Sequence, residues 1–318
     1  MATRNRIIYQ SQAVALLGDS TADTITTLNG VQSVTYGIEV GREDVNHFGA
    51  LGAIDRIIME APTATQEVQF HYPNGMLTGI LGAVVTGALG SATNGLIIAL
   101  DADVGQDYNS VNSTANAVKL EGGRLSSFSL EMSVGAIPTI TLGFEGTGLS
   151  YAAQTVPVPS DYSVSLGTFA DVVVTLANGS TSHMAHAQSA TLSFDLGSEA
   201  LQQLGGGGLS YDRVPTFPAT ASLEVEGLAP DRGMSLTLAG IATKASGGGS
   251  NTDAGGRANV SISTGSANTH LKFELVNATL DSVSYNNAIG DNATCSATFS
   301  VSIGGTASSS TLRIIPNS

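Results

Sequence analysis

The chain is poor in the residues on which several classes of protein depend. Its 318 residues include no tryptophan and a single cysteine, Cys295. One cysteine excludes a framework of internal disulfides and is typical of a protein made in a reducing compartment. The first ten residues lack the apolar core of a secretory signal peptide. Because sugar sites use exposed aromatic platforms, eight tyrosines without tryptophan disfavour a carbohydrate-binding protein.

Basic residues are also scarce. Lys and Arg number 12 against 26 Asp and Glu, which gives a formal net charge of −14. A surface that grips nucleic acid neutralises phosphates with clustered Lys and Arg, and no such cluster occurs here. Residues Met76–Leu100 carry no charge, but their glycines and the turn at Asn94-Gly95 disfavour a membrane span. They predict a buried helix or strand, then a turn and a strand at Leu96–Leu100.

Glycine, serine, threonine, alanine and valine are abundant, and many short runs alternate between apolar and polar residues. This pattern predicts a mainly β protein. The length predicts about two domains. No phosphate-cradling Gly-Lys-Ser/Thr motif occurs.

The stretch Gln32–Pro62 recurs as Gln188–Pro218 at one constant offset. At a nearly equal offset, Leu125–Ser129 recurs as Leu280–Ser284. The sequence therefore predicts a tandem duplication of a unit of roughly 155 residues. We place the first domain, with an N-terminal arm, at residues 1–155 and the second at residues 156–318, with residues 147–165 as the linker.

Each half offers four long strands with one apolar and one polar face, such as Ser33–Val40 and Thr139–Gly146. Residues Gly41–Ala53 interrupt the alternation and predict a long loop. Eight such strands present more polar face than a compact monomer needs. A water-filled barrel shared between subunits uses them all and removes the open edges.

At GVQSVTYGIEVGREDVNHFGALGAIDRIIMEAPT and at SFSLEMSVGAIPTITLGFEG the sequence resembles the major tail tube proteins of tailed bacteriophages. The resemblance implies a β-sandwich or barrel with a flanking helix in each domain, packed in rings so that hairpins line a shared inner barrel. Single-domain relatives form hexameric rings, so a duplicated subunit implies a trimeric, pseudo-hexameric ring. Rings stack through a loop that matches Gly41–Ile54 here, with Gly197–Ser210 as its counterpart.

The polar phase of the strands supplies the residues that we expect to face the lumen. They are Thr35, Glu39, Glu67, Gln69, Ser129, Glu131, Thr141, Glu145, Asp195, Glu224 and Glu226. A lumen of carboxylates and hydroxyls repels phosphate and lets DNA pass without binding. The residues expected in the ring-stacking loop are Arg42, Glu43, Asp44, Asn46 and His47.

The resemblance also implies a virion protein of the tail, assembled in the host cytoplasm, that contacts itself, a tape-measure protein, a tail terminator and baseplate or distal tail proteins. It implies no enzymatic activity, no cofactor and no membrane. The alternative is a related virion ring protein of the distal tail or baseplate, or a capsid decoration protein.

Three motifs suggest chemistry and fail on their spacing. Gly18-Asp19-Ser20 resembles an esterase nucleophile block, but the late Asp-x-x-His that would activate the serine is missing. Asp101–Asp107 lacks the glycine and the terminal glutamate of a calcium loop. His183 and His186 have no third metal ligand nearby in the sequence. We therefore predict no catalytic, cofactor or metal site.

Overall fold

The structure is a computed structural model, and it describes strands and the turns that connect them. The described residues are 12–17, 25–49, 55–58, 62–72, 95–100, 116–153, 156–158, 169–176, 181–183, 187–205, 208–228, 257–264, 271–289, 292–303 and 312–316. These residues form strands and no helix. The predicted mainly β fold class is therefore confirmed. The stretch in which the sequence allows a helix, residues 76–94, lies outside them.

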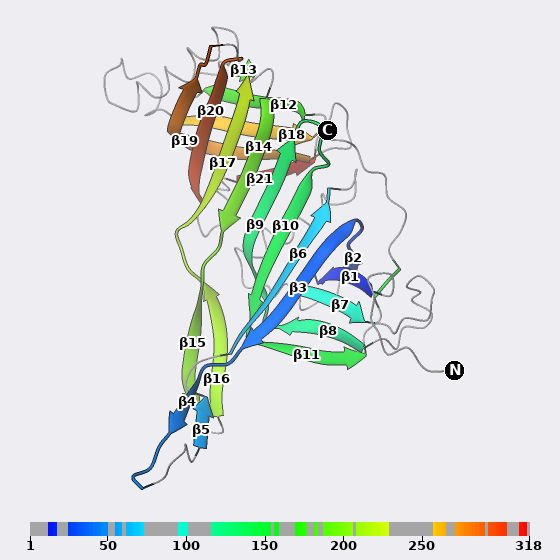
Figure 1. Ribbon diagram of the computed structural model, residues 1–318, viewed down its shortest axis with the longest axis vertical. Coiled ribbons are helices and arrows are strands. Elements are labelled where there is room, and N and C mark those ends of the chain that lie inside the picture. Colours follow the sequence, from blue (N-terminus) through cyan, green and yellow to red (C-terminus); the bar gives the residue numbers. More distant parts are fainter. Residues whose placement is uncertain are drawn as a thin grey trace.

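One large antiparallel sheet runs through both halves of the chain (Figure 1). In spatial order its strands are β13 (Thr181–His183), β12 (Phe169–Leu176), β18 (Arg257–Thr264), β19 (Leu271–Asn286), β20 (Thr294–Ile303), β17 (Ala219–Leu228), β14 (Ala187–Asp195), β9 (Arg124–Ser133), β10 (Thr139–Gly146), β6 (Thr63–His71) and β3 (Val31–Glu39). A further strand, β21 (Leu312–Pro316), pairs with β19.

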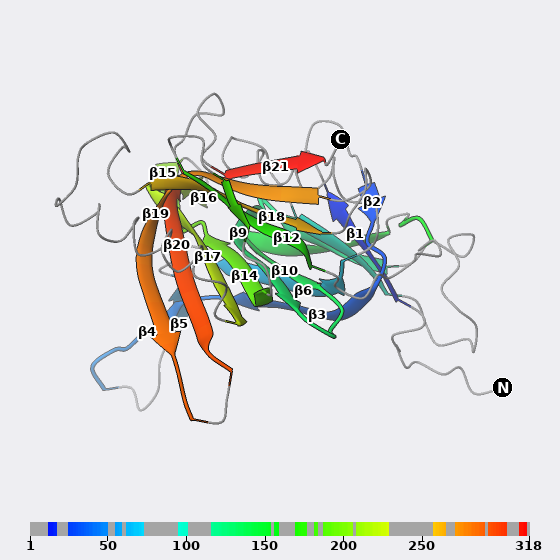
Figure 2. The ribbon, with the colours of Figure 1, turned by 90° about the horizontal axis from the view of Figure 1, so that it is seen from above.

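A second sheet of five strands lies against the first half of the large sheet (Figure 2). Its order is β11 (Gly148–Ala153), β8 (Asn116–Glu121), β7 (Gly95–Leu100), β1 (Gln12–Leu17) and β2 (Ile25–Thr27). Two hairpins extend from one end of the large sheet (Figure 1). They are β4 (Arg42–Val45) with β5 (Asp55–Ile58), and β15 (Ser198–Gly205) with β16 (Gly208–Pro215).

Period-two alternation explains why these segments form strands with one buried face. In β17, Leu223 and Val225 are buried while Glu224 and Glu226 are exposed. In β20, Phe299 and Val301 are buried, and the serines and threonines that alternate with the apolar residues are not. The apolar faces pack into one continuous core that includes residues of both halves.

The two halves have the same strand order. The first half contributes β3-β6-β10-β9 to the large sheet, and the second contributes β14-β17-β20-β19. The strands behind them also correspond, because β2-β1-β7-β8-β11 matches β13-β12-β18-β19-β21. In both halves, the chain passes from the strands behind to the four front strands through a residue in the left-handed backbone conformation. This residue is Gly122 at φ 59° in the first half and Asn277 at φ 58° within β19 in the second, two residue types that tolerate this conformation.

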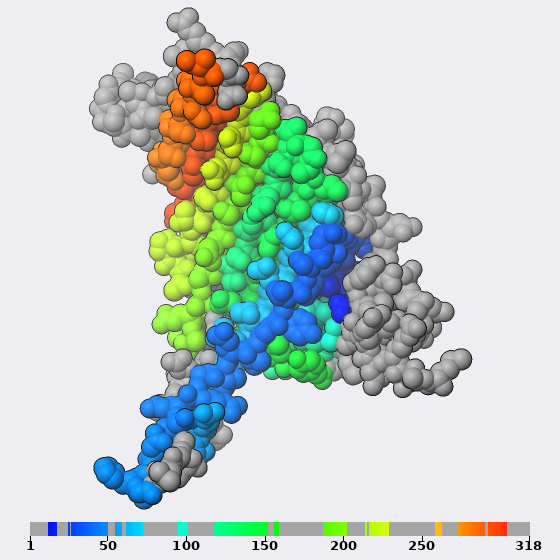
Figure 3. Space-filling view, in the orientation of Figure 1, coloured from blue at the N-terminus to red at the C-terminus, as the bar shows by residue number. Residues whose placement is uncertain are grey.

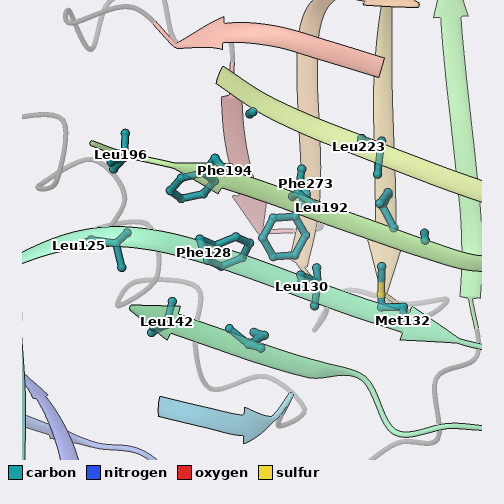
Figure 4. Packing of buried hydrophobic residues seen from close by; sticks show 14 of the residues in the cluster. Leu125, Phe128, Leu130, Met132, Leu142, Leu192, Phe194, Leu196, Leu223 and Phe273 are labelled. Atoms are coloured by element: carbon teal, nitrogen blue, oxygen red, sulfur yellow. The ribbon is translucent and has the colours of Figure 1, made fainter. Parts of the chain in front are cut away.

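The halves are joined where β14 pairs with β9. We call this pairing the seam. Across it Phe194 faces Phe128, and their rings stack with centroids 4.9 Å apart and planes 7° from parallel. Leu192 faces Leu130 in the same register. All four side chains are buried, and Figure 4 shows the two stacked rings lying on neighbouring strands.

The segment predicted as a linker is partly regular structure. Within residues 147–165, Gly148–Ala153 form β11, which pairs with β8, so the connection between the halves is shorter than the predicted linker. Beyond β11, Val156 is buried against Ala15 and Ile97 of the five-stranded sheet. The hydroxyl of Thr27 donates a hydrogen bond of 3.1 Å to the carbonyl oxygen of Pro157. Residues 156 and 157 therefore pack on the first half of the chain.

The seam gives a matched test of core packing. Phe194→Ala removes a buried, stacked ring, and we expect it to lower the free energy of unfolding by about 3–5 kcal/mol. Ile38→Ala changes the residue that corresponds to Phe194 in the repeat, but Ile38 is 49% exposed. We expect this control to cost less than about 1 kcal/mol in the monomer. Urea denaturation at concentrations where sedimentation shows a monomer measures both, and equal losses would contradict the packing role of the seam.

Candidate functional site

The residues expected to face a lumen lie together on one face of the large sheet. The strand register connects them across neighbouring strands: Thr35 faces Glu67, Gln69 faces Thr141, and Thr141 faces Ser129. In the second half, Glu224 and Glu226 face residues of β14. All eleven residues share this face, because each occupies one of the alternate positions of its strand from which side chains point away from the core. We call it the polar face, and Figure 3 shows it as adjacent bands from β3 to β19.

Hydroxyl groups separate the carboxylates on the polar face. Glu131 lies between Thr139 and Thr191 on the neighbouring strands, and Glu224 lies between Thr191 and Thr298. Asp195 lies between Ser127 and Thr220 in the same way.

Carboxylates in one row are therefore at least two strands apart. With strands about 4.8 Å apart, this is a spacing of about 10 Å, close to the Debye length at physiological salt. Carboxylates on different strands of this acidic face therefore repel one another only weakly, whereas Glu224 and Glu226 lie closer together, two residues apart on β17.

Cations are rare on the strands that build the polar face. Across β3, β6, β10, β9, β14, β17, β20 and residues 279–286 of β19, the one Lys or Arg is Arg124, at the start of β9. Arg124 faces Glu145 across the β9–β10 pair. Within these strands, the arrangement offers a phosphate backbone almost no cationic contact, and its negative potential opposes adhesion of nucleic acid.

The residues expected to stack rings lie in a hairpin. The sequence predicted a long loop at Gly41–Ala53, whereas Arg42–Val45 forms β4 and pairs with β5. Arg56 of β5 donates a hydrogen bond to Asp44 of β4, which fixes the register of the two strands. Glu43, Asn46 and His47 are in the described part of the hairpin, where His47 is exposed and the next residue, Phe48, is fully exposed.

The counterpart segment, Gly197–Ser210, is also a hairpin rather than a loop, because it contains β15 and the start of β16. Its base is fastened to the first half of the chain. The hydroxyl of Ser198 donates a hydrogen bond of 2.7 Å to Glu145 of β10. The backbone amide of Leu196 donates one of 2.6 Å to the carbonyl oxygen of Ser126 of β9. Both bonds continue the seam towards the hairpin.

We call β3, β6, β10, β9, β14, β17, β20 and the end of β19 the eight-strand array. Its two ends are open edges. Among the described residues, β3 pairs only with β6, and residues 280–286 of β19 pair only with β20. Apolar residues are exposed at both edges: Tyr36 at 40% and Ile38 at 49% on β3, and Tyr285 at 41% on β19. An edge with free backbone groups and exposed apolar side chains is a surface on which another strand can pair.

Sequence reasoning missed one acidic residue of this face, Asp281. Strict alternation from Val283 and Tyr285 places it on the apolar face. The register shifts between Leu280 and Ser282, however, so that Asp281 occupies a β-bulge, where an extra residue re-aims the side chain. The first half has the corresponding bulge at Ser126. Two polar residues between apolar ones, Ser126-Ser127 and Asp281-Ser282, are the signal that would have found it.

Few of the residues in the three motifs that suggest chemistry belong to the described part of the chain. Cys295 is buried, and burial raises the pKa of its thiol while a hydrogen bond with Tyr285 lowers it less. No group of three or more potential metal ligands is found in the described ranges. Gly18–Ser20, Asp101–Asp107 and His186 lie outside them. In the part of the chain that the structure covers, no helix is long and apolar enough to cross a membrane.

Comparison with known proteins gives one family. A family model described as "Phage tail tube protein" matches residues 62–267, which is more than half of the chain. A solved structure titled "Tail of empty GTA particle computed with helical refinement, C6 symmetry" is similar at 12% sequence identity and a TM-score of 0.31, over 46% of this chain and 95% of that chain. No curated protein sequence matches the chain.

Proposed function

The chain belongs to the phage tail tube protein family, and we propose that three copies close into a pseudo-hexameric ring whose acidic lumen conducts DNA during ejection. Proteins of this family are structural subunits that assemble with themselves into stacked rings in the virion tail. The proposal adds the number of copies, the face that lines the channel and the passage of DNA. It also assigns residues 1–155 and 156–318 to two tandem tube domains.

The observation that carries the proposal is the polar face that crosses the seam without a break. Two four-strand modules with the same order form one sheet, and their carboxylates and hydroxyls share one side of it. A sheet that is acidic on one side and open at both edges is complete only when further copies extend it into a closed barrel. Six modules, from three chains, correspond to the six subunits of a ring of single-domain relatives.

The acidic lumen gives DNA a path without sites of adhesion. Carboxylates repel the phosphate backbone, and hydroxyl groups hold water against the wall. A positively charged lining would retain DNA through the release of counterions. The same channel would hold the tape-measure protein before ejection, and the ends of the stack would meet the tail terminator and the distal tail or baseplate. We expect these contacts to form in the host cytoplasm, where the tail assembles.

Electron microscopy of the purified protein tests the ring. We expect stacked rings or hollow tubes, and end-on averages with threefold symmetry and six lobes. Rings with true sixfold symmetry would contradict closure by three chains. A uniform monomer that also fails to extend a tail initiated on purified baseplates would contradict the tube role itself and favour a decoration protein.

Charge reversal in the middle of the polar face tests the lumen. Glu67 and Glu224 are exposed, correspond in the two modules and lie on β6 and β17, neither of which is an edge strand. In virions that carry Glu67→Lys and Glu224→Lys, we expect tubes of normal length and slower ejection of DNA, because lysines on the wall attract phosphate. The matched control, Glu67→Gln and Glu224→Gln, should slow ejection much less. Ejection kinetics equal to wild type in the lysine variant would place this face outside the lumen.

Removal of the first hairpin tests stacking. Replacing residues 42–58 by a short Gly-Ser turn deletes β4, β5 and the exposed Phe48, while the sheet that precedes it keeps its core. We expect single rings that no longer polymerise, with an unchanged thermal midpoint of the fold. The same replacement of residues 198–215 is the comparison. The second hairpin has Ser198 and Ala200 where the first has Arg42 and Asp44, and it has Gly205 and Gly208 where its two strands meet. Tubes of normal length from the first variant would refute a stacking role.

A further inference from the structure

We propose that the open edge of β3 pairs with the open edge of β19 of a second copy in one defined register, and that Arg42 and Asp281 form an ion pair across this junction. The inference deepens the proposed ring and rests on it for closure. Its substance is the register and the ion pair, neither of which follows from membership of the family. The register is obtained by applying the sequence repeat to the seam, and the ion pair from the charged residues that this register brings near each other.

The seam supplies the template. The repeat aligns β14 with β3 through Gln188 and Gln32, and β9 with the end of β19 through Leu125 and Leu280. The seam pairs β14 with β9. The corresponding partner of β3 is therefore residues 280–286 of β19. Within one chain these two edges lie at opposite ends of the eight-strand array, so the partner is a second copy.

The register follows residue by residue. Leu192 faces Leu130 and Phe194 faces Phe128 in the seam. Their counterparts predict that Tyr36 faces the partner subunit's Tyr285 and that Ile38 faces the partner subunit's Val283. Asp195 faces Ser127 in the seam, and its counterpart predicts that Glu39 faces the partner subunit's Ser282. The junction then separates acids by hydroxyls as the rest of the polar face does.

Exposure of the edge residues agrees with this register. The seam residues Leu192, Phe194, Leu130 and Phe128 are each at most 4% exposed. Their counterparts Tyr36, Ile38 and Tyr285 are 40%, 49% and 41% exposed in the isolated chain. The apolar side chains left uncovered are thus those that the seam geometry would bury against a second copy.

Beyond the paired strands, the seam and the junction differ in charge. In the seam Leu196 bonds to the bulged residue Ser126, and Ser198 bonds to Glu145. The corresponding contacts of the junction bring Val40 to the bulged residue Asp281, with Arg42 two residues further along. The repeat maps Glu145 to Ser300, so the carboxylate that Ser198 meets in the seam is missing from the junction. The acidic group that the junction brings near Arg42 is instead Asp281, where the seam has Ser126. Arg42 is exposed, and Asp281 is exposed on the bulge, so both are available to pair.

Cysteine cross-linking tests the register. Cys295 faces Tyr285 within β19 and β20, so Cys295→Ala is the background. In this background, Tyr36→Cys with Tyr285→Cys should give a covalent ladder that ends at a closed trimer on non-reducing gels, because facing Cβ atoms of paired strands come within disulfide reach. Tyr36→Cys with Ser284→Cys is the control, since a slip of one residue puts the two side chains on opposite faces.

The outcomes separate the junction from the ring. Trimer cross-linking by the first pair and not by the second supports the register. Cross-linking by the control pair, or rings visible by electron microscopy without cross-linking of the first pair, overturns the register while the ring stands. Absence of both rings and cross-links overturns the junction and the proposed ring together.

Charge exchange tests the ion pair. Arg42→Asp and Asp281→Arg should each raise the protein concentration needed for ring formation by about fivefold, because each places like charges together at every junction. The double variant Arg42→Asp with Asp281→Arg restores opposite charges and should assemble near the wild-type concentration. A double variant as defective as the single ones would overturn the ion pair. The variant that lacks residues 42–58 also lacks Arg42. The protein concentration at which it forms rings shows the effect of losing Arg42 together with its hairpin.

Discussion

The pairing of β14 with β9 is the interaction on which the rest of the structure depends. It turns two four-strand modules into one sheet, aligns their apolar faces into one core and carries the polar face from one half to the other. Backbone hydrogen bonds set the distance between the strands, and the stacked rings of Phe128 and Phe194 fix their register from the core side. A slip of one residue would turn these rings to the polar face, so core packing and the acidic surface are specified together.

The polar face shows how a wall can be acidic without being destabilised by its own charge. A wall built from adjacent carboxylates would pay for their repulsion in every ring of a stack. Here serine and threonine lie on the strands next to Glu131, Asp195 and Glu224. Hydroxyl groups hydrogen-bond to water and to each other, as Ser193 and Ser222 do at 3.0 Å. The polar face is therefore negative, with Arg124 as the one Lys or Arg of its strands.

Most of the polar face could be predicted from the sequence, because alternation is local and survives in every strand with one buried side. Glu67, Glu131 and Glu224 follow from it directly. Asp281 does not, since a bulge shifts its strand by one residue and strict period two then assigns it to the wrong side. The hairpin of β4 and β5 also escaped, because its exposed strands have no apolar face to reveal them. That β14 lies beside β9 has no local signal at all, since the two strands are far apart in the chain.

In the ring that we propose, there are two kinds of boundary between modules, one inside each chain and one between chains. The inner boundary forms as the chain folds, so it can bury a phenylalanine pair with no risk of premature association. The outer boundary must remain open until a second copy arrives, and an open apolar edge invites unwanted pairing. Smaller or amphipathic residues stand there instead, namely Ile38, Val283 and the tyrosines. Glu39 and Asp281 place charge beside them, and the net charge of −14 opposes contact between free subunits. In the proposed ring, divergence of the two copies of the repeat at this boundary would therefore allow one sequence to fold first and assemble second.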